Sequence, residues 1–395
     1  MLKSNLKARV KSSKFIYTLY YLLGSFFLRV MSVFIKRDPN LLLFVSYGGK
    51  KYDDSPRKVY EYLLSRKEYS DLEMVWAFDA PENYPEVNSK IRIDSLRFFK
   101  TALKAGYWIT NSSISRGLNY RKRTTKNIFF THGMTGIKRI GNDLNSKEGT
   151  YSLAFKERFD YIFIEGYEEV PILTQAWGYA PDVFKRTGLP RNDDLYQVSE
   201  QEIIAIKEKL LLPAGKKIIL YAPTFREQSR DEFKANVLSF PFHIEKWEQE
   251  LGEEYVLLIT AHYEVSRYLD EIHETDFVRN MFGYPVLNDL LKVADILITD
   301  YSSVVFDYSL LERPILCYGY DYEEYNSQRG FYIDIRNLFS QGVIEEEETL
   351  INTIKRLDYQ EECLFTKKNI KDKYVYCDGH AAENAVKIIF EDAEK

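Results

Sequence analysis

Cysteine is scarce in this chain, and the familiar nucleotide-binding and hydrolase motifs are missing. The three cysteines, Cys317, Cys363 and Cys377, cannot supply a disulfide framework, and their spacing matches no zinc-binding pattern. The chain has no Walker loop, no GxGxxG after an expected strand, no GxSxG and no HExxH. These absences exclude the most familiar NTPase, dinucleotide oxidoreductase and hydrolase classes.

Positive charge is in short supply beyond the first 37 residues. The 395 residues include 54 basic and 59 acidic ones, and the first 37 contain eight basic residues and no acidic ones. The remainder therefore has 46 basic and 59 acidic residues, a net charge of −13. Because a body this acidic repels phosphate backbones, we expect no nucleic-acid partner.

The first 37 residues form a basic and apolar arm. Residues 15–28 carry no charge, Arg29 interrupts the apolar run, and residues 31–35 resume it. A membrane-spanning helix needs about 20 apolar residues, and this run reaches that length only with the arginine included. We therefore predict an amphipathic helix at an anionic membrane surface, with lysines among the headgroups. The alternative is a helix that packs on the protein's own core.

Short apolar runs alternate with amphipathic ones after residue 38. The expected strands lie at residues 41–46, 73–78, 107–110, 127–131, 161–165, 217–222, 255–260, 296–299 and 314–318. Several of these runs are apolar throughout, as in parallel strands covered on both faces, and helical patterns lie between them. The alternation predicts an α/β fold with parallel sheets.

A domain boundary is expected near residues 190–215, where a Gly-Leu-Pro turn is followed by a charged helix and Pro-Ala-Gly. At about 150 residues per domain, the length predicts two or three domains. We expect an arm at 1–37 and two α/β domains at 38–195 and 196–395, which face each other across a cleft. Ligands of such folds bind at domain interfaces and at the carboxyl edges of the sheets.

Two histidines follow expected strands. His132 precedes Gly133 in a stretch that continues to Lys138 and Arg139, and His262 follows a later strand. A histidine at the carboxyl edge of a sheet can accept a hydroxyl proton, and nearby cations can offset phosphate charge. A lone histidine is more often structural, so the residues alone leave both interpretations open.

Hydroxyl, carboxyl and guanidinium groups follow other strands. Thr224 and Arg226 come after one strand, and Asp300, Ser302 and Ser303 come after another. A serine at a helix start, together with the unpaired N–H groups there, suits a phosphate, and an arginine can bind phosphate through two hydrogen bonds. The alternatives are a simple N-cap serine and a surface arginine.

Adjacent acids occur at 53–54 and at 193–194, but no DxD pair of a metal-dependent glycosyltransferase is present. We interpret these acids as turn or cap residues.

Several segments together resemble one family. They read THGMTGIKRIGND at 131–143, TGLPRND at 187–193, YAPTFR at 221–226, TAHYEV at 260–265, ILITDYSSVVFDYSLLERPILCYGYDYEEY at 296–325 and RGFYID at 329–334. In this order they resemble the CDP-glycerol glycerophosphotransferase family, the teichoic-acid primases and polymerases of Gram-positive bacteria. The resemblance covers roughly residues 40 to 390.

The resemblance implies a GT-B-like fold of two Rossmann-like domains and a peripheral enzyme at the cytoplasmic face of the bacterial membrane. Such an enzyme transfers glycerol phosphate, or a related polyol phosphate, from a CDP-linked donor to a hydroxyl of a lipid-linked acceptor and releases CMP. The acceptor belongs to teichoic acid or to a capsular or surface polymer. The N-terminal domain is then on the acceptor side and the C-terminal domain binds the donor nucleotide. No cofactor is expected, and the sequence leaves metal dependence open.

The resemblance also implies roles for particular residues. His132 and His262 match the family's functional pair of histidines. His132 is the candidate general base and His262 the residue at the leaving group, although the two roles can be exchanged. The proposed donor-phosphate residues are Thr224, Arg226, Asp300, Ser302, Ser303, Arg329, Asp378 and Gly379, and the acceptor-side residues are Gly133, Lys138 and Arg139.

Three other functions stay open. CDP-ribitol is an alternative donor within the same family, and a nucleotide-sugar glycosyltransferase of GT-B fold is the nearest competitor outside it. A noncatalytic protein that binds the membrane surface is a third reading.

Overall fold

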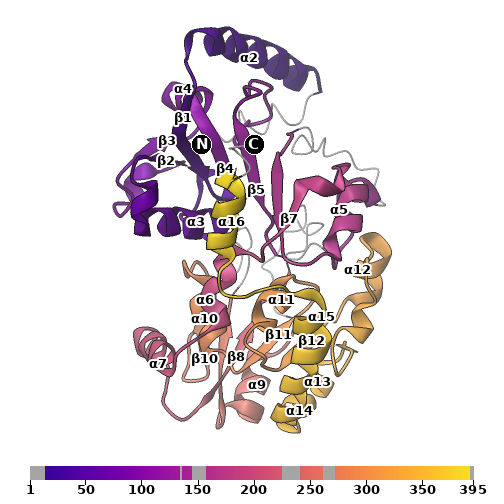
Figure 1. Cartoon of the computed structure of the whole chain (residues 1–395). Coiled ribbons are helices and arrows are strands. Elements are labelled where there is room, and N and C mark those ends of the chain that lie inside the picture. The colour runs from indigo at the N-terminus through magenta and orange to yellow at the C-terminus, as the bar shows by residue number, and fades with distance from the viewer. Residues whose placement is uncertain (1–13, 134–135, 145–156, 225–240, 261–271, 392–395) are drawn as a thin grey trace.

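Two parallel β-sheets with helices on both faces make up the molecule (Figure 1). The computed structural model describes residues 14–133, 136–144, 157–224, 241–260 and 272–391. The first sheet has the strand order β3-β2-β1-β4-β5-β6-β7, and the second has the order β10-β9-β8-β11-β12-β13. The predicted α/β class and GT-B-like arrangement are therefore confirmed.

The strands of the first sheet are β1 (Asp38–Val45), β2 (Glu73–Phe78), β3 (Lys90–Arg92), β4 (Ala105–Thr110), β5 (Lys126–Phe130), β6 (Tyr161–Ile164) and β7 (Phe184–Arg186). Those of the second are β8 (Lys217–Tyr221), β9 (Tyr255–Ile259), β10 (Val278–Asn280), β11 (Ile296–Thr299), β12 (Ile315–Tyr318) and β13 (Val343–Ile344). All nine predicted strands are present. Four short strands, β3, β7, β10 and β13, were not predicted, because two or three residues are too few to show a periodic pattern.

The helices of the first half are α2 (Lys14–Phe34), α3 (Asp54–Ser65), α4 (Leu96–Lys104), α5 (Glu169–Trp177), α6 (Asp193–Tyr196) and α7 (Glu200–Lys209). Those of the second half are α9 (Ile244–Leu251), α10 (Leu287–Val293), α11 (Val304–Ser309), α12 (Tyr322–Gln328), α13 (Glu347–Lys355), α14 (Tyr359–Phe365), α15 (Asp372–Tyr374) and α16 (Ala381–Glu391). Serine side chains cap the N-termini of α4 and α7. Ser95 Oγ accepts a hydrogen bond from Phe98 N (3.1 Å), and Ser199 Oγ accepts one from Glu202 N (3.2 Å).

The order of strands places the ligand-binding edge. In the first sheet the direction of strand addition reverses between β1 and β4, and in the second it reverses between β8 and β11. Ligands of doubly wound sheets bind at the carboxyl ends of strands beside such a reversal. The segments that follow β1, β4, β5, β8 and β11 are therefore expected to build the site.

The last helix returns to the first sheet. Ala385, Val386 and Ile389 of α16 pack in the same core as residues of β1, and α16 lies beside α3 in Figure 1. Its start is capped from a distance: the Asp193 carboxylate accepts hydrogen bonds from Ala381 N (2.8 Å) and from the next backbone N–H (2.9 Å). We propose a boundary near the end of α6, with α16 assigned to the N-terminal domain.

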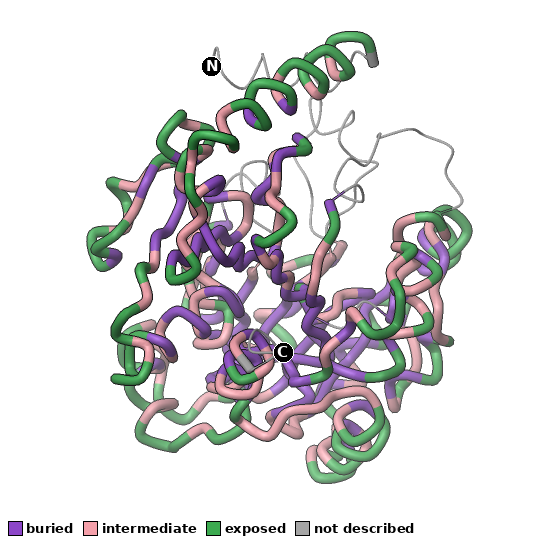
Figure 2. Tube along the Cα trace, turned by 45° about the horizontal axis from the view of Figure 1, so that its top comes forward, coloured by how far each residue is buried: buried purple, intermediate pink, exposed green. Residues whose placement is uncertain are grey.

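Helix α2 lies across one end of the first domain and is mostly exposed (Figure 2). One stripe packs inward, where Leu28 joins the core of the first sheet and Arg29 Nε donates to Asn119 O (2.9 Å). The outer face is apolar, with Phe26 69% and Phe27 58% exposed. By length and composition residues 15–34 can cross a membrane, but only 11% of that stretch is buried in the protein. The helix therefore has an anchored polar stripe and an uncovered apolar face.

Candidate active site

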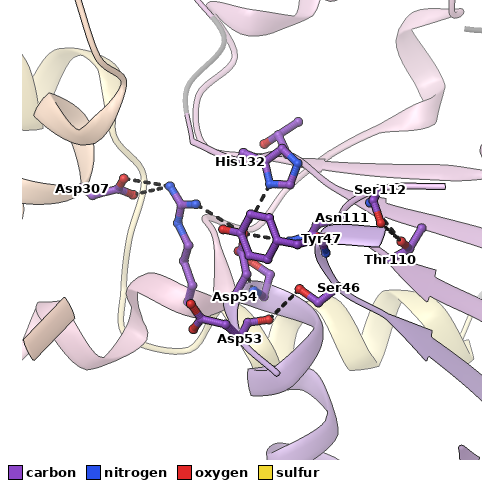
Figure 3. A network of polar contacts seen from close by, with 12 residues as sticks. Ser46, Tyr47, Asp53, Asp54, Thr110, Asn111, Ser112, His132 and Asp307 are labelled. Carbon is purple, nitrogen blue, oxygen red and sulfur yellow. Dashed lines mark hydrogen bonds and ion pairs between the residues drawn. The ribbon is translucent and has the colours of Figure 1, made fainter. Parts of the chain in front are cut away.

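His132 lies directly after β5 and contacts a buried carboxylate at the start of α3 (Figure 3). Its Nδ1 is 3.3 Å from Oδ2 of Asp54. The histidine side chain is 46% exposed, whereas the Asp54 side chain is fully buried. The ring of Tyr47 stacks on the imidazole at a centroid distance of 5.3 Å and an interplanar angle of 15°. The imidazole is thus fixed on one edge and one face while part of it remains accessible.

Asp54 is held by several donors. Oδ2 accepts from Tyr47 Oη (2.8 Å) and from Asn111 Nδ2 (2.9 Å), and Oδ1 accepts from Ser55 N (2.6 Å). Its backbone has a φ of 68°, a left-handed conformation that costs a non-glycine residue about 1–2 kcal/mol. Backbone strain of this kind is concentrated at functional sites. The strained backbone at Asp54 therefore lowers the stability of the fold but places the carboxylate against His132.

The Asp54 carboxylate is ionised. Burial by itself raises the pKa of Asp54, but the charge of Arg191 and the hydrogen bond to His132 outweigh burial and hold that pKa well below its ordinary value. An ionised Asp54 accepts a hydrogen bond from the N–H at Nδ1 of His132, which leaves Nε2 to take a proton from a substrate. This is the arrangement of a general base with an orienting carboxylate.

Arg191 joins this pair to the second domain. It follows β7, its side chain is only 15% exposed, and its Nη1 lies 3.5 Å from Oδ2 of Asp54. Nη2 donates to both carboxylate oxygens of Asp307 on α11 (2.8 and 2.7 Å). Burial lowers the pKa of Arg191, but the carboxylates of Asp307 and Asp54 raise it well above its ordinary value. The guanidinium is therefore a permanent charge between two acids of different domains.

A second layer of buried polar groups supports Asp307. Asn192 Nδ2 donates to Asp307 Oδ1 (2.7 Å) and to Glu165 Oε1 (2.9 Å). Burial raises the pKa of Glu165 well above its ordinary value, and the nearby carboxylates of Asp307 and Glu169 raise it further. Within the described part of the chain, Glu165 Oε2 is buried without a hydrogen-bond partner. Glu165 is therefore a buried acid whose ionisation is costly.

The structure brings Gly133 and Ser303 together. Gly133 has a φ of +105°, and a Cβ placed on it would lie 3.0 Å from Ser303 Oγ and 2.9 Å from Arg191 Nη2. A side chain is excluded here by both conformation and space. The residue after the candidate base thus lies next to the serine predicted to bind donor phosphate.

The other polar residues after β8 and β11 have structural partners. Asp300 Oδ1 accepts from Thr224 N (2.8 Å) and Tyr301 N (2.6 Å), so this carboxylate holds two loops together. Ser302 Oγ is 3.4 Å from Val304 N, while Ser303 occupies the N-cap position of α11 without a capping hydrogen bond from its side chain. A simple N-cap role therefore does not account for the hydroxyl of Ser303.

Residues of the acceptor-side loop pair with the RGFYID segment. Lys138 forms an antiparallel bridge with Phe331, and Arg139 N donates to Gly330 O (3.1 Å). Arg329 Nε donates to Arg139 O (3.3 Å). The structure thus places Arg329, predicted to lie at the donor, against the two cations predicted to lie at the acceptor. A phosphate role for these three residues stays a prediction.

Asp378 and Gly379 shape the approach to α16. Asp378 Oδ1 accepts from His380 N (2.9 Å) and Oδ2 from Asn384 Nδ2 (3.2 Å). Gly379 has a φ of 76°, and a Cβ there would meet the Tyr196 ring at 2.8 Å. A donor-phosphate role for Asp378 and Gly379 stays a prediction. His262 and Arg226 lie outside the described residues. Among the residues that are described, no three His, Cys, Asp or Glu side chains gather as a metal site.

Sequence reasoning missed the partners of His132. The interpretation of Asp54 as a turn or cap residue is incomplete, because its carboxylate orients the histidine. The cap interpretation does account for Asp193, although the capped helix is α16. Arg191 and Asp307 lie within motif segments, but the motifs alone do not indicate that two residues so far apart in sequence form an ion pair.

The two parallel α/β units and the oriented histidine where they meet define an enzyme of the GT-B-like class. The family model described as CDP-glycerol:poly(glycerophosphate) glycerophosphotransferase matches residues 26–391. The chain belongs to this family and is a glycerophosphotransferase-type enzyme, as its motifs predicted.

Relatives of known function span nearly the whole chain. The teichoic acid glycerol-phosphate transferase of Staphylococcus aureus is 32% identical over 91% of this chain and 91% of its own length. The teichoic acid poly(glycerol phosphate) polymerase of Bacillus spizizenii is 31% identical, with coverage of 89% and 92%. The ribitol-phosphate polymerase TarK of Staphylococcus aureus is 26% identical, with coverage of 90% and 69%.

Solved structures of the wall teichoic acid polymerase TagF have the same fold. One variant superposes with a TM-score of 0.81 at 27% identity and covers 96% of this chain and 98% of that one. A TagF variant with histidine replaced by asparagine, soaked with CDPG, gives the same TM-score at 26% identity and the same coverage. A UDP-GlcNAc 2-epimerase from Neisseria meningitidis, at 13% identity and a TM-score of 0.54, shares the fold alone.

Glu165 gives the protein a specific pH dependence. Because the pKa of Glu165 is higher in the folded than in the unfolded protein, the folded state binds more protons, and stability falls as pH rises above about 4.3 towards the folded pKa. Glu165→Gln mimics the protonated acid and removes this loss. Urea unfolding at a series of pH values measures the free energy of unfolding. As pH rises, this free energy should increase for the variant relative to the native protein by up to ~1.4 kcal/mol per pH unit.

The exposed neighbour Glu168 provides the control. Glu168→Gln should follow the native protein at every pH, within about 0.5 kcal/mol. Parallel stability curves for Glu165→Gln and the native protein would contradict a raised pKa at Glu165.

Proposed function

We propose that this enzyme transfers glycerol phosphate from CDP-glycerol to a hydroxyl of a lipid-linked acceptor, with release of CMP, in the synthesis of teichoic acid or a related surface polymer. The observation that carries the proposal is the His132–Asp54 pair, where Gly133 lies next to Ser303, in a chain that matches a glycerol-phosphate transferase over 91% of its length. Glycerol phosphate is favoured over ribitol phosphate because the glycerol-phosphate relatives are more similar, at 31–32% against 26% identity.

The proposed reaction is a direct displacement at phosphorus. The acceptor hydroxyl attacks the phosphorus that carries glycerol, and His132 Nε2 takes the hydroxyl proton. A new bond forms between the acceptor oxygen and this phosphorus, while the bond from phosphorus to the bridging oxygen breaks and CMP leaves with that oxygen. Asp54 keeps the imidazole oriented and stabilises its positive charge after proton transfer.

Charge neutralisation supplies the rest of the catalysis, since phosphoryl transfer depends mainly on positioning and electrostatics. Ser303 and Ser302 are proposed to contact the donor phosphates from the start of α11. Lys138, Arg139 and Arg329, which meet at the contact between the two domains, are proposed to attract the phosphates of donor and acceptor. His262 is proposed to act at the leaving group, in line with the family resemblance.

The membrane is the proposed location of the acceptor. Helix α2 presents exposed phenylalanines over an anchored stripe, which suits an interfacial helix at the cytoplasmic face with its apolar side in the acyl boundary. The lipid-linked acceptor then lies in the plane to which the enzyme is bound.

A donor panel tests the proposed reaction. The purified protein, incubated with a lipid-linked acceptor and separately with CDP-glycerol, CDP-ribitol or UDP-glucose, should release CMP from CDP-glycerol. His132→Ala should reduce the rate by roughly 10²–10⁴, the usual contribution of a general base. His243→Ala, which alters an exposed histidine paired with Glu347, should keep full activity. CMP release only from CDP-ribitol would identify the ribitol alternative, and UDP release alone would identify a sugar transferase.

The exposed face of α2 can be tested in the full-length protein. Phe26→Ser with Phe27→Ser removes apolar area that is uncovered in the protein, so folding should be unaffected while partition into vesicles weakens roughly 10- to 100-fold. Leu64→Ser with Leu364→Ser, two exposed leucines on α3 and α14, should leave partition unchanged. Sedimentation with phosphatidylglycerol vesicles measures both pairs. An equal loss of vesicle binding in both double variants would show that α2 is not the membrane contact.

A further inference from the structure

A pocket of about 210 Å³ lies under α2, and the proposed reaction makes no use of it. Tyr17 and Tyr21 of α2 line one side, and the segment between β4 and β5 lines the other. The Tyr17 hydroxyl donates to Gly117 O (3.2 Å), so the helix is bound directly to the pocket wall. Pockets for nucleotide-sized ligands occupy roughly 300–1,000 Å³. This pocket therefore suits a smaller group.

The wall of the pocket is positively charged. Arg121, Lys122, Arg123 and Arg158 line it. Arg121 is paired with Asp160 (2.5 Å), but within the described part of the chain no carboxylate forms an ion pair with the other three. The acid of the pocket, Glu157, is occupied by internal donors.

Those donors to Glu157 come from the protein itself. Ser113 Oγ donates to Oε2 (2.5 Å), and Oε1 accepts from Ser115 N (3.1 Å) and Asn127 Nδ2 (3.3 Å). With its oxygens so engaged, Glu157 is a weak partner for the cations of the wall. Burial lowers the pKa of Lys122, and the nearby positive charge of Arg37 lowers it further. Lys122, whose ammonium donates to Ile35 O, thus lies near a second cation at the end of α2, and an anion in the pocket would offset the positive charge of this wall.

The apolar face of α2 indicates where such an anion comes from. Phe26 and Phe27 on this helix are exposed, and Tyr17 and Tyr21 of the pocket belong to its first half. When the phenylalanines enter the acyl boundary, tyrosines and basic residues beside them lie at the depth of the headgroups, where both are favoured. The membrane affinity of an interfacial helix increases with its buried apolar area and with electrostatic attraction to anionic lipids, so a basic pocket beside α2 would strengthen attachment.

We propose that the pocket under α2 binds the phosphodiester headgroup of an anionic phospholipid, with Lys122, Arg123 and Arg158 around the phosphate. This rests on the membrane location given under the proposed function. The helix and the pocket then contact the bilayer at two points, which fixes the rotation of the enzyme on the surface as well as its depth. A fixed rotation keeps the site of His132 turned towards acceptors in the same membrane.

The test compares two pairs of substitutions that remove the same charge from the full-length protein. Arg123→Gln with Arg158→Gln alters two exposed pocket residues, and Arg356→Gln with Lys368→Gln alters two exposed residues of the second domain. A basic residue held at an anionic surface contributes about fivefold in affinity, so the pocket pair should weaken binding to phosphatidylglycerol vesicles roughly 30-fold. The distant pair should have no effect, since it lies beyond the screening length of about 8 Å. Neither pair should change binding to phosphatidylcholine vesicles.

Soluble probes separate the lipid headgroup from simple phosphate. Calorimetry with dihexanoyl phosphatidylglycerol below its micelle concentration should show binding to the native protein and to the distant pair but not to the pocket pair. Inorganic phosphate at the same concentration should not displace it. Equal vesicle binding by both pairs, or displacement by phosphate alone, would overturn the proposal.

CMP release from CDP-glycerol with a soluble acceptor is measured on the same samples. If the native protein releases no CMP, the proposed reaction is contradicted. The proposal for the pocket is then tested by the vesicle binding alone. The pocket pair should retain the native rate, because neither residue belongs to the catalytic site.

Discussion

Arg191 is buried between two carboxylates that come from different halves of the chain, and the site is organised around this charge. A buried guanidinium is tolerated only when acids pair with it, and a buried acid such as Asp54 stays ionised only beside a cation. Removal of one partner leaves an uncompensated buried charge, which costs about 3–5 kcal/mol. The Asp54–Arg191–Asp307 chain therefore ties the docking of the second domain to the charge state of the carboxylate that orients His132.

This dependence explains the local architecture. Asp54 adopts a strained backbone conformation to reach both His132 and Arg191, and Gly133 has no side chain because Arg191 and Ser303 occupy that space. Gly133, which follows the candidate base, and Ser303 at the start of α11 thereby lie next to each other where the two sheets dock. Helix α2 and its cationic pocket lie at the opposite end of the first domain, where we propose that they contact the membrane.

The sequence predicted the fold in outline because parallel strands buried on both faces are continuous apolar runs, as in β4 and β9. It also predicted that two such sheets face each other with the ligand site at their carboxyl edges, and Gly133 after β5 lies next to Ser303 after β11. The role of Asp54 was not predicted, because adjacent acids at a helix start are usually turn or cap residues. The Arg191–Asp307 ion pair was not predicted, because its partners are 116 residues apart in the sequence. A single sequence contains no signal for a contact between residues so far apart. The return of α16 to the first sheet was missed for the same reason.

A double-mutant cycle on His132 and Asp54, measured as kcat for CMP release from CDP-glycerol, tests the central claim most directly. If Asp54 acts by orienting His132, Asp54→Asn lowers kcat by roughly 10²–10⁴, and the double variant with His132→Ala is no slower than His132→Ala alone. Circular dichroism and CDP-glycerol binding confirm that each variant is folded. Losses that multiply in the double variant would show that the two residues act independently and would contradict the account.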